Sequence, residues 1–234
     1  MSIRDHLDIS AYLVVGPENT MGRPVSDIVR AAVQAGFTCV QIRSKTASAR
    51  ELIALTGQAA AVLAEEGCSE RAALLVDDRL DVVLAARKQG IKVDGVHVGQ
   101  SDIPPEICRA FLGEDAIVGL SAPTGELLDY VRTTDVRDID YFGAGPLHET
   151  ATKPDCGLDA QGNILTRSFQ ELTALAKASP LPVVVGGGVK LRDIPALAAT
   201  GVAGFFVVSA VAGDRTPKKA AAGLVEAWQA ACGK

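Results

Sequence analysis

The sequence lacks any apolar run long enough to cross a membrane, and its first residues lack the apolar core of a secretory signal peptide. A membrane-spanning helix needs about 20 predominantly apolar residues, and no window of the 234 residues approaches this. The chain begins MSIRDHLDIS, which is charged and polar. We therefore expect a soluble, cytoplasmic protein without a membrane partner.

The sequence also lacks the cysteine patterns of disulfide scaffolds and zinc sites. Its five cysteines are an odd number, are widely spaced and include no CxxC pair. Basic runs are missing too, and the formal net charge is -5. The cysteines are interpreted as reduced thiols, and nothing favours nucleic acid as a partner.

What the chain has instead is eight short apolar runs, in a composition that is 48% apolar and can bury a sizeable core. The runs are residues 11–15, 39–43, 73–77, 94–98, 116–120, 140–145, 182–187 and 204–210. Segments with helical periodicity, such as 48–67 and 167–178, separate most of them. Strands that alternate with helices form βαβ units and a parallel sheet.

Eight such units without a visible linker favour an α/β fold, namely a closed (β/α)8 TIM barrel in a single domain that spans residues 1–234. The alternative is an open, doubly wound sheet. Such a sheet often carries GxGxxG after its first strand, whereas this chain reads GPENTMG there.

Polar residues gather at the carboxyl ends of the predicted strands, where barrel enzymes carry their active sites. They are Gln41, Arg43 and Lys45; Asp77 and Asp78; His97, Gln100 and Asp102; Ser121; Thr150, Thr152 and Lys153; and Gly186, Gly187, Gly188 and Ser209. The amino ends of the strands show no comparable set. The sequence therefore predicts a site at one mouth of the barrel.

The second run continues as VQIRSK, which places Gln41, Arg43 and Lys45 on one face of a strand. Two neighbouring cations repel each other unless an anion lies between them. Arginine forks onto phosphate oxygens and lysine adds a point charge, while an amide suits the edge of a heterocycle. The alternative is a charged strand end that faces solvent.

Three carboxylates, Asp77, Asp78 and Asp102, follow neighbouring strands. Unpaired, they would raise each other's pKa. A magnesium ion resolves this repulsion, because Mg²⁺ favours one or two carboxylates together with substrate phosphate oxygens. The alternative is salt bridging, with Arg79 as the neighbouring cation in the sequence.

A second anion site is indicated by the glycines at 186–188 and by VVSA at 207–210. Glycines let backbone N–H groups approach an anion, and the loops after strands seven and eight often bind phosphate in these barrels. A tight turn is the alternative.

The segment 147–163 is long for a βα loop, and it is interpreted either as a lid or as a disordered insertion. His97 is interpreted as a structural residue or as one that supports the site. Two anion sites and one carboxylate cluster around one mouth suit two phosphorylated substrates and a divalent metal.

Seven motifs in this order resemble the thiamine-phosphate synthase family. They are VQIRSK, LLVDDRLDVVLA, GVHVGQSD, VGLSAPT, DYFGAGPLHETATKPD, VVVGGGV and GFFVVSAV. The resemblance implies a (β/α)8 barrel that acts as a transferase in thiamine biosynthesis. Its members join 4-amino-2-methyl-5-hydroxymethylpyrimidine diphosphate to 4-methyl-5-(2-phosphoethyl)thiazole, which gives thiamine phosphate and pyrophosphate.

The resemblance also implies roles for individual residues. Gln41 would hold the aminopyrimidine, and Asp77 would line the same substrate site. Carried over from the family, the catalytic residues on the diphosphate are Arg43, Lys45, Ser121 and Lys153; the Mg²⁺ ligands are Asp78 and Asp102; the residues on the thiazole side are Thr150 and Thr152; and its phosphate would lie at Gly187, Gly188, Val208 and Ser209.

Two positions depart from the family's pattern. The family commonly has Asn-Asp where this chain has Asp77-Asp78, and frequently has His-Thr where this chain reads APTGEL (122–127). Adjacent residues of a strand point to opposite faces, so we expect Asp78 alone to be the metal ligand. Asp77 is then expected to be held by a cation such as Arg79 or Lys153.

Three other functions stay open at this point. A thiazole tautomerase shares the fold and some motifs but needs no diphosphate site. Another phosphate-binding isomerase or epimerase would need an acid–base pair, for which His97 with an aspartate is the candidate. A non-catalytic sensor of thiamine phosphate is the third. The sequence also leaves open whether the chain forms a homo-oligomer.

Overall fold

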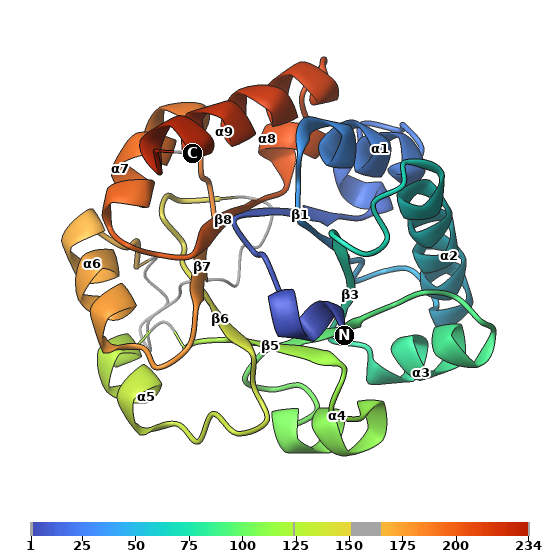
Figure 1. The fold of residues 1–234 in the computed structure, drawn as a ribbon, viewed down its shortest axis with the longest axis horizontal. Coiled ribbons are helices and arrows are strands. Elements are labelled where there is room, and N and C mark those ends of the chain that lie inside the picture. Colours follow the sequence, from blue (N-terminus) through green and yellow to red (C-terminus); the bar gives the residue numbers. More distant parts are fainter. Residues whose placement is uncertain (1, 124, 151–164, 234) are drawn as a thin grey trace.

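Eight parallel strands close into a barrel at the centre of the computed structural model, which describes residues 2–123, 125–150 and 165–233 (Figure 1). The strands are β1 (Ala11–Val15), β2 (Cys39–Ile42), β3 (Ala73–Asp77), β4 (Gly95–Val98), β5 (Ile117–Ser121), β6 (Tyr141–Ala144), β7 (Val183–Val185) and β8 (Gly204–Val207). Each strand pairs with the next, and β8 pairs with β1. The predicted (β/α)8 barrel is confirmed, and only β5 extends beyond its predicted run, by one residue.

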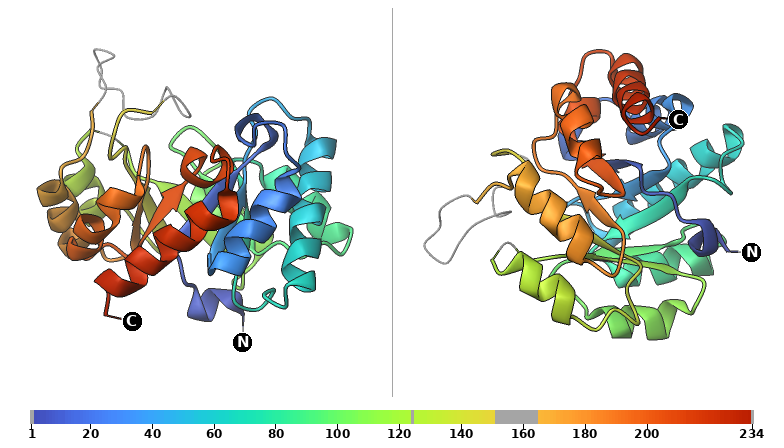
Figure 2. Two further views of the ribbon diagram at one scale, coloured as in Figure 1. Left: turned by 90° about the horizontal axis from the view of Figure 1, so that it is seen from above. Right: turned by 60° about the vertical axis from the view of Figure 1, so that its left-hand side comes forward.

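Helices surround the barrel in Figure 1 and cover its sides in both views of Figure 2. They are α1 (Val25–Ala35), α2 (Ala49–Glu65), α3 (Leu80–Lys88), α4 (Pro105–Leu112), α5 (Leu127–Thr133), α6 (Phe169–Ala178), α7 (Ile194–Ala199), α8 (Ser209–Ala212) and α9 (Pro217–Ala231), with short 3-10 helices η1 (Ile3–His6), η2 (Pro17–Asn19) and η3 (Leu191–Asp193). Of the helices described, none combines the length and the apolar character that crossing a membrane requires.

Local sequence explains where two of the longer helices begin. Ser48 precedes α2, and its hydroxyl accepts a hydrogen bond from the backbone N–H of Glu51, whose side chain returns to the Ser48 backbone. Ser168 and Glu171 repeat this capping box at α6. Each box satisfies two N–H groups that have no partner within the helix.

Strand alternation divides the buried side chains into two layers, one inside the barrel and one between barrel and helices. Along β2, Val40 and Ile42 belong to the outer layer, whereas Cys39 packs in the inner layer and Gln41 lines the cavity at the barrel mouth. The inner layer also contains Tyr12 from β1. The period of two predicted for this strand is therefore confirmed.

The amino-terminal end of the barrel is closed by η1, which lies at the bottom of the left view in Figure 2. Asp140 anchors this end, because its carboxylate accepts hydrogen bonds from Arg4 Nε at 2.7 Å, Arg109 Nη2 at 2.8 Å and the Val118 N–H at 2.7 Å. Arg109 is only 5% exposed, so it is held as a buried ion pair. This end is closed by structural contacts, and the opposite mouth remains for a site.

Candidate active site

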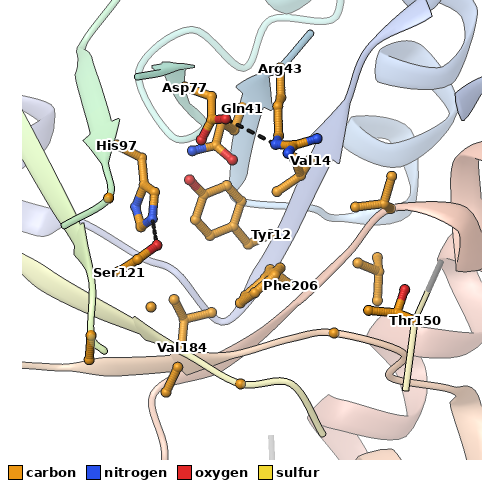
Figure 3. A pocket seen from close by; sticks show the side chains of 18 of the residues that line it. Tyr12, Val14, Gln41, Arg43, Asp77, His97, Ser121, Thr150, Val184 and Phe206 are labelled. Atoms are coloured by element: carbon orange, nitrogen blue, oxygen red, sulfur yellow. Dashed lines mark hydrogen bonds and ion pairs between the residues drawn. The ribbon is translucent and has the colours of Figure 1, made fainter. Parts of the chain in front are cut away.

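A cavity of about 320 Å³ opens at the carboxyl ends of the strands. Figure 3 shows part of its lining, with Thr150 set apart from the group of Gln41, Arg43 and Asp77. The structure brings most of the predicted site residues into this cavity, namely Gln41, Arg43, Lys45, Asp77, Asp78, Asp102, Ser121, Thr150, Gly187, Gly188, Val208 and Ser209. Thr152, Lys153 and most of the predicted lid at 147–163 lie outside the described residues.

Arg43 and Lys45 follow the end of β2, and each contacts a carboxylate at the end of β3: Asp77 is the last residue of that strand and Asp78 is the next. Arg43 Nε lies 3.0 Å from Asp77 Oδ2, and both side chains are nearly buried. Lys45 Nζ donates to Asp78 Oδ2. Both cations therefore line the cavity while a carboxylate holds each of them, so the predicted metal cluster is also a salt-bridge network.

The expectation that Arg79 could hold Asp77 is wrong. Arg79 bonds to Asp81 through Nε at 2.8 Å and through Nη2 at 2.6 Å. The cation beside Asp77 is Arg43, which comes from the adjacent strand. Sequence proximity favoured Arg79, but its fork points to the first turn of α3.

The expectation that Asp77 and Asp78 point to opposite faces of a strand is wrong: both line the cavity, because the strand ends between them. β3 ends at Asp77, and Asp78 adopts a left-handed backbone conformation with φ of 61°. This conformation is uncommon outside glycine, although aspartate tolerates it better than most residues. The Asp78 N–H donates to the His97 carbonyl at 2.7 Å, which fixes the turn.

Asp78 and Asp102 lie close enough to change each other's ionisation. Burial raises the pKa of Asp102, and the neighbouring Asp78 carboxylate raises it further. Burial also acts to raise the pKa of Asp78, but the hydrogen bonds with Lys45 and Asp102 outweigh it and lower that pKa. The described residues hold no cluster of three or more typical metal ligands. Two carboxylates are nevertheless the donor set on which Mg²⁺ relies when phosphate oxygens supply further ligands.

Gln41 presents an unsatisfied donor to the cavity. The residue is only 3% exposed, and its Nε2 has no hydrogen-bond partner within the described part of the chain. Figure 3 shows its amide beside Asp77. A buried amide without a partner costs about 1–3 kcal/mol, and an acceptor on a bound heterocycle would recover this free energy.

Ser121 ends a line of four polar side chains that crosses the barrel interior. Its hydroxyl lies 2.9 Å from His97 Nε2, His97 Nδ1 lies 2.9 Å from the Tyr141 hydroxyl, and that hydroxyl lies 2.9 Å from the Tyr12 hydroxyl. His97 thus supports a predicted site residue. The tyrosines were not predicted, although a tyrosine in an otherwise apolar inner strand is a signal that a polar partner is buried nearby.

The glycine loop after β7 forms the other end of the cavity. Gly187 and Gly188 have φ of 79° and 73°. A Cβ at Gly187 would lie 2.5 Å from Pro146 Cβ, and one at Gly188 would lie 2.9 Å from His148 Cβ. The glycines therefore allow a tight turn packed against the loop after β6, and the same turn exposes its backbone to the cavity.

Glu18 supports the site from outside the cavity lining, and sequence reasoning missed it. It follows β1 in GPENTMG, and its Oε1 accepts hydrogen bonds from the Thr46 hydroxyl at 2.8 Å and from the Ser44 hydroxyl. Burial acts to raise the pKa of Glu18, but these hydrogen bonds outweigh it and lower that pKa. Glu18 therefore stays ionised and fixes the loop that carries Lys45.

The chain is similar to known proteins along most of its length. A sequence model of the family described as thiamine monophosphate synthase matches residues 11–211. The thiamine-phosphate synthase of Corynebacterium efficiens is 43% identical over 201 residues, which are 86% of each chain. That of Moorella thermoacetica is 34% identical and covers 95% of this chain and 97% of its own. Among solved structures, the thiamine phosphate pyrophosphorylase from Pyrococcus furiosus has a TM-score of 0.76 and 26% identity over 98% of both chains.

Proposed function

The chain belongs to the thiamine monophosphate synthase family, and we propose how its cavity divides the work of the family's condensation between two subsites. The enzyme is a transferase of thiamine biosynthesis. It joins 4-amino-2-methyl-5-hydroxymethylpyrimidine diphosphate to 4-methyl-5-(2-phosphoethyl)thiazole and releases pyrophosphate. The observation that carries the proposal is one cavity with paired cations and carboxylates at one end and an exposed glycine turn at the other.

The cation end is proposed to hold the diphosphate. Arg43 uses Nε for Asp77, which leaves the two Nη groups of its planar fork for phosphate oxygens. Lys45 lines the same end of the cavity beside Asp78. Ser121 adds a hydroxyl, and Lys153, which lies outside the described residues, is proposed to add a third cation. These groups would neutralise charge that grows on the leaving group, which is where electrostatic catalysis is most effective.

Asp78 and Asp102 are proposed to hold Mg²⁺ beside the diphosphate. Their proximity supports this, because burial and then the neighbouring Asp78 carboxylate raise the pKa of Asp102, and a cation bound by both carboxylates would relieve their repulsion. When bound, the ion would supply positive charge to the leaving pyrophosphate. Asp77 is proposed to stay outside the metal's ligands, since Arg43 occupies one of its oxygens.

The two rings are proposed to meet between these ends. Gln41 would donate its unpaired N–H to a ring nitrogen of the aminopyrimidine. Thr150 and Thr152 would line the thiazole side, and its phosphate would lie against the backbone of the glycine turn. The residues proposed for that phosphate are Gly187, Gly188, Val208 and Ser209.

The reaction needs no general base from the protein. The bond between the pyrimidine methylene carbon and the diphosphate oxygen breaks, and its electron pair leaves with pyrophosphate. An electron-rich aminopyrimidine stabilises the positive charge on that carbon, and the thiazole nitrogen attacks it without losing a proton. Alignment of the two substrates then supplies much of the remaining acceleration.

The site favours this reaction over an isomerase or epimerase. Such an enzyme would need His97 as an acid or base, yet both ring nitrogens of His97 contact protein hydroxyls. The Arg43–Asp77 and Lys45–Asp78 pairs form a diphosphate end that a thiazole tautomerase would not need.

The test is to incubate the purified chain with both substrates and Mg²⁺ and to measure thiamine phosphate and pyrophosphate by chromatography. Equal amounts of the two products are expected, and neither should form when one substrate is omitted. Tautomerisation of a thiazole phosphate alone, or binding of thiamine phosphate without turnover, would refute the proposal. Mg²⁺ dependence and a cytoplasmic location stay predictions.

A further inference from the structure

The four side chains Tyr12, Tyr141, His97 and Ser121 form a continuous hydrogen-bonded line through the barrel. They come from β1, β6, β4 and the end of β5, and each of the three contacts measures 2.9 Å. The line starts in the apolar inner layer and ends at the cavity, where Figure 3 shows the His97–Ser121 contact. Tyr12, His97 and Ser121 all line the cavity, but Ser121 alone among the four side chains is not buried.

The barrel makes room for this line with glycines. Strand register places Gly119 between His97 and Tyr141. A Cβ at Gly119 would lie 2.4 Å from the Tyr141 oxygen and 2.5 Å from His97 Nδ1, and one at Gly143 would lie 3.1 Å from His97 Cε1. The histidine and tyrosine rings stack at 5.5 Å between centroids and 29° between planes. Glycines in the interior of a strand often mark such a close approach.

The direction of the hydrogen bonds decides what Ser121 offers to a bound anion. Burial raises the pKa of both tyrosines well above its usual value, so both keep their protons. If the Tyr141 hydroxyl donates to His97 Nδ1, the neutral imidazole carries its proton on Nε2 and donates to Ser121 Oγ. The serine hydrogen is then left for the cavity. In the opposite direction the serine donates to His97 and presents only lone pairs to the anion.

We propose that Tyr12, Tyr141 and His97 are positioning residues that set the polarity of the Ser121 hydroxyl, so that it donates to the leaving diphosphate. This inference rests on the proposed function, because it assumes that the diphosphate lies beside Ser121. The direction is Tyr12 to Tyr141, Tyr141 to His97 and His97 to Ser121. Charge on the leaving group grows as its bond to carbon breaks, so the hydroxyl's contribution is largest in the transition state.

The test is a double-mutant cycle between His97 and Ser121, read as kcat and KM for each substrate. Ser121→Ala should lower kcat by about 100-fold, the effect of losing one oxyanion-type donor. His97→Leu should lower kcat by roughly 10- to 100-fold and leave the KM for the thiazole phosphate within about threefold. Combined with Ser121→Ala, His97→Leu should cause little further loss, because the two residues act as one unit.

Two further variants separate positioning from packing. His97→Gln can still donate an amide N–H to Ser121 and should recover most of the loss caused by His97→Leu. Tyr141→Phe keeps the ring and removes the hydroxyl, so it should lower kcat in the wild-type background and have no effect in the Ser121→Ala background. Thr56→Val is the control, because it removes a buried hydroxyl that donates to the Leu52 carbonyl within α2, away from the cavity, and kcat should not change.

Additive losses in either cycle, with folded variants by circular dichroism, would overturn the inference. So would a His97→Gln enzyme as slow as His97→Leu. If His97→Leu does not fold, the Tyr141→Phe cycle decides alone. Inactivity of the wild-type chain would instead refute the proposed function.

Discussion

Replacing Asp77 by asparagine tests how the cation end of the cavity is organised. The Asp77 side chain is 6% exposed and Arg43 is 13% exposed, with 3.0 Å between Oδ2 and Nε. Asparagine keeps an oxygen that accepts from Arg43 Nε but removes the negative charge. The orientation of the guanidinium is therefore retained, and the repulsion between this carboxylate and a bound diphosphate is lost.

The magnitude follows from the kind of hydrogen bond that is exchanged. A charge-assisted hydrogen bond contributes about 1.5–3 kcal/mol and a neutral one about 0.5–1.5 kcal/mol. Asp77→Asn should therefore lower the free energy of unfolding by about 1–2 kcal/mol, which is a fall in Tm of roughly 2–8 °C. Asp77→Ala leaves Arg43 without this partner, and the loss should reach about 3–5 kcal/mol.

Enzymatic activity should distinguish the roles of Asp77 and Asp78 more clearly than stability does. Asp77→Asn should keep the rate and the Mg²⁺ requirement within about tenfold of wild type, equivalent to about 1.4 kcal/mol, and the KM for the pyrimidine diphosphate should be unchanged or lower. Asp78→Ala should nearly abolish turnover. The assay is a Mg²⁺ titration of pyrophosphate release for both variants. If Asp77→Asn raises the Mg²⁺ requirement as much as Asp78→Ala does, Asp77 is a metal ligand and the reasoning is wrong.

Three further outcomes are expected. Treatment with EDTA should abolish turnover and added Mg²⁺ should restore it; full activity in metal-free buffer would contradict the roles of Asp78 and Asp102. Arg43→Ala and Lys45→Ala should weaken use of the pyrimidine diphosphate far more than binding of the thiazole phosphate, and equal losses measured by calorimetry would contradict the two subsites. Asp140→Ala should lower the free energy of unfolding by about 3–5 kcal/mol, because Arg109 loses the carboxylate of a buried pair. At temperatures where the variant is folded, its kcat should match that of wild type. A selective loss of kcat would show that the amino-terminal end of the barrel affects the site.

The strand order and the location of the site could be predicted because both depend on local periodicity. A barrel strand has apolar layers on both faces, so its residues read as a short apolar run, and its polar side chains are placed where the run ends. Gln41 could be assigned to the inner face by alternation along β2. These inferences require no knowledge of which residues lie opposite one another.

The pairing of Arg43 with Asp77 could not be predicted, because it depends on register. β2 and β3 pair Gln41 with Leu75 and Ile42 with Val76. Continuing this register by one residue places Arg43 opposite Asp77. The sequence shows only that Arg79 is two positions from Asp77, yet over that distance the chain has left the strand and reached the residue that precedes α3. Nor does the sequence show the left-handed backbone of Asp78, which turns two adjacent carboxylates toward one cavity.

The hydrogen-bonded line from Tyr12 to Ser121 also depends on register, so it could not be predicted, although the sequence contains indirect signs of it. GVHV, AIVGL and DYFGAG each read as an ordinary inner strand, and all three contain a glycine; Gly119 and Gly143 stand in the strand interior with no turn to require them. Such a glycine implies that something large fills the space of the missing side chain, but the ring that fills it lies on another strand. His97 lies opposite Gly119, and Gly119 lies opposite Tyr141. Once the register is fixed, the close contact of glycine, histidine and tyrosine follows from it, and Ser121 is left as the one member of the line that is not buried and can act on a substrate.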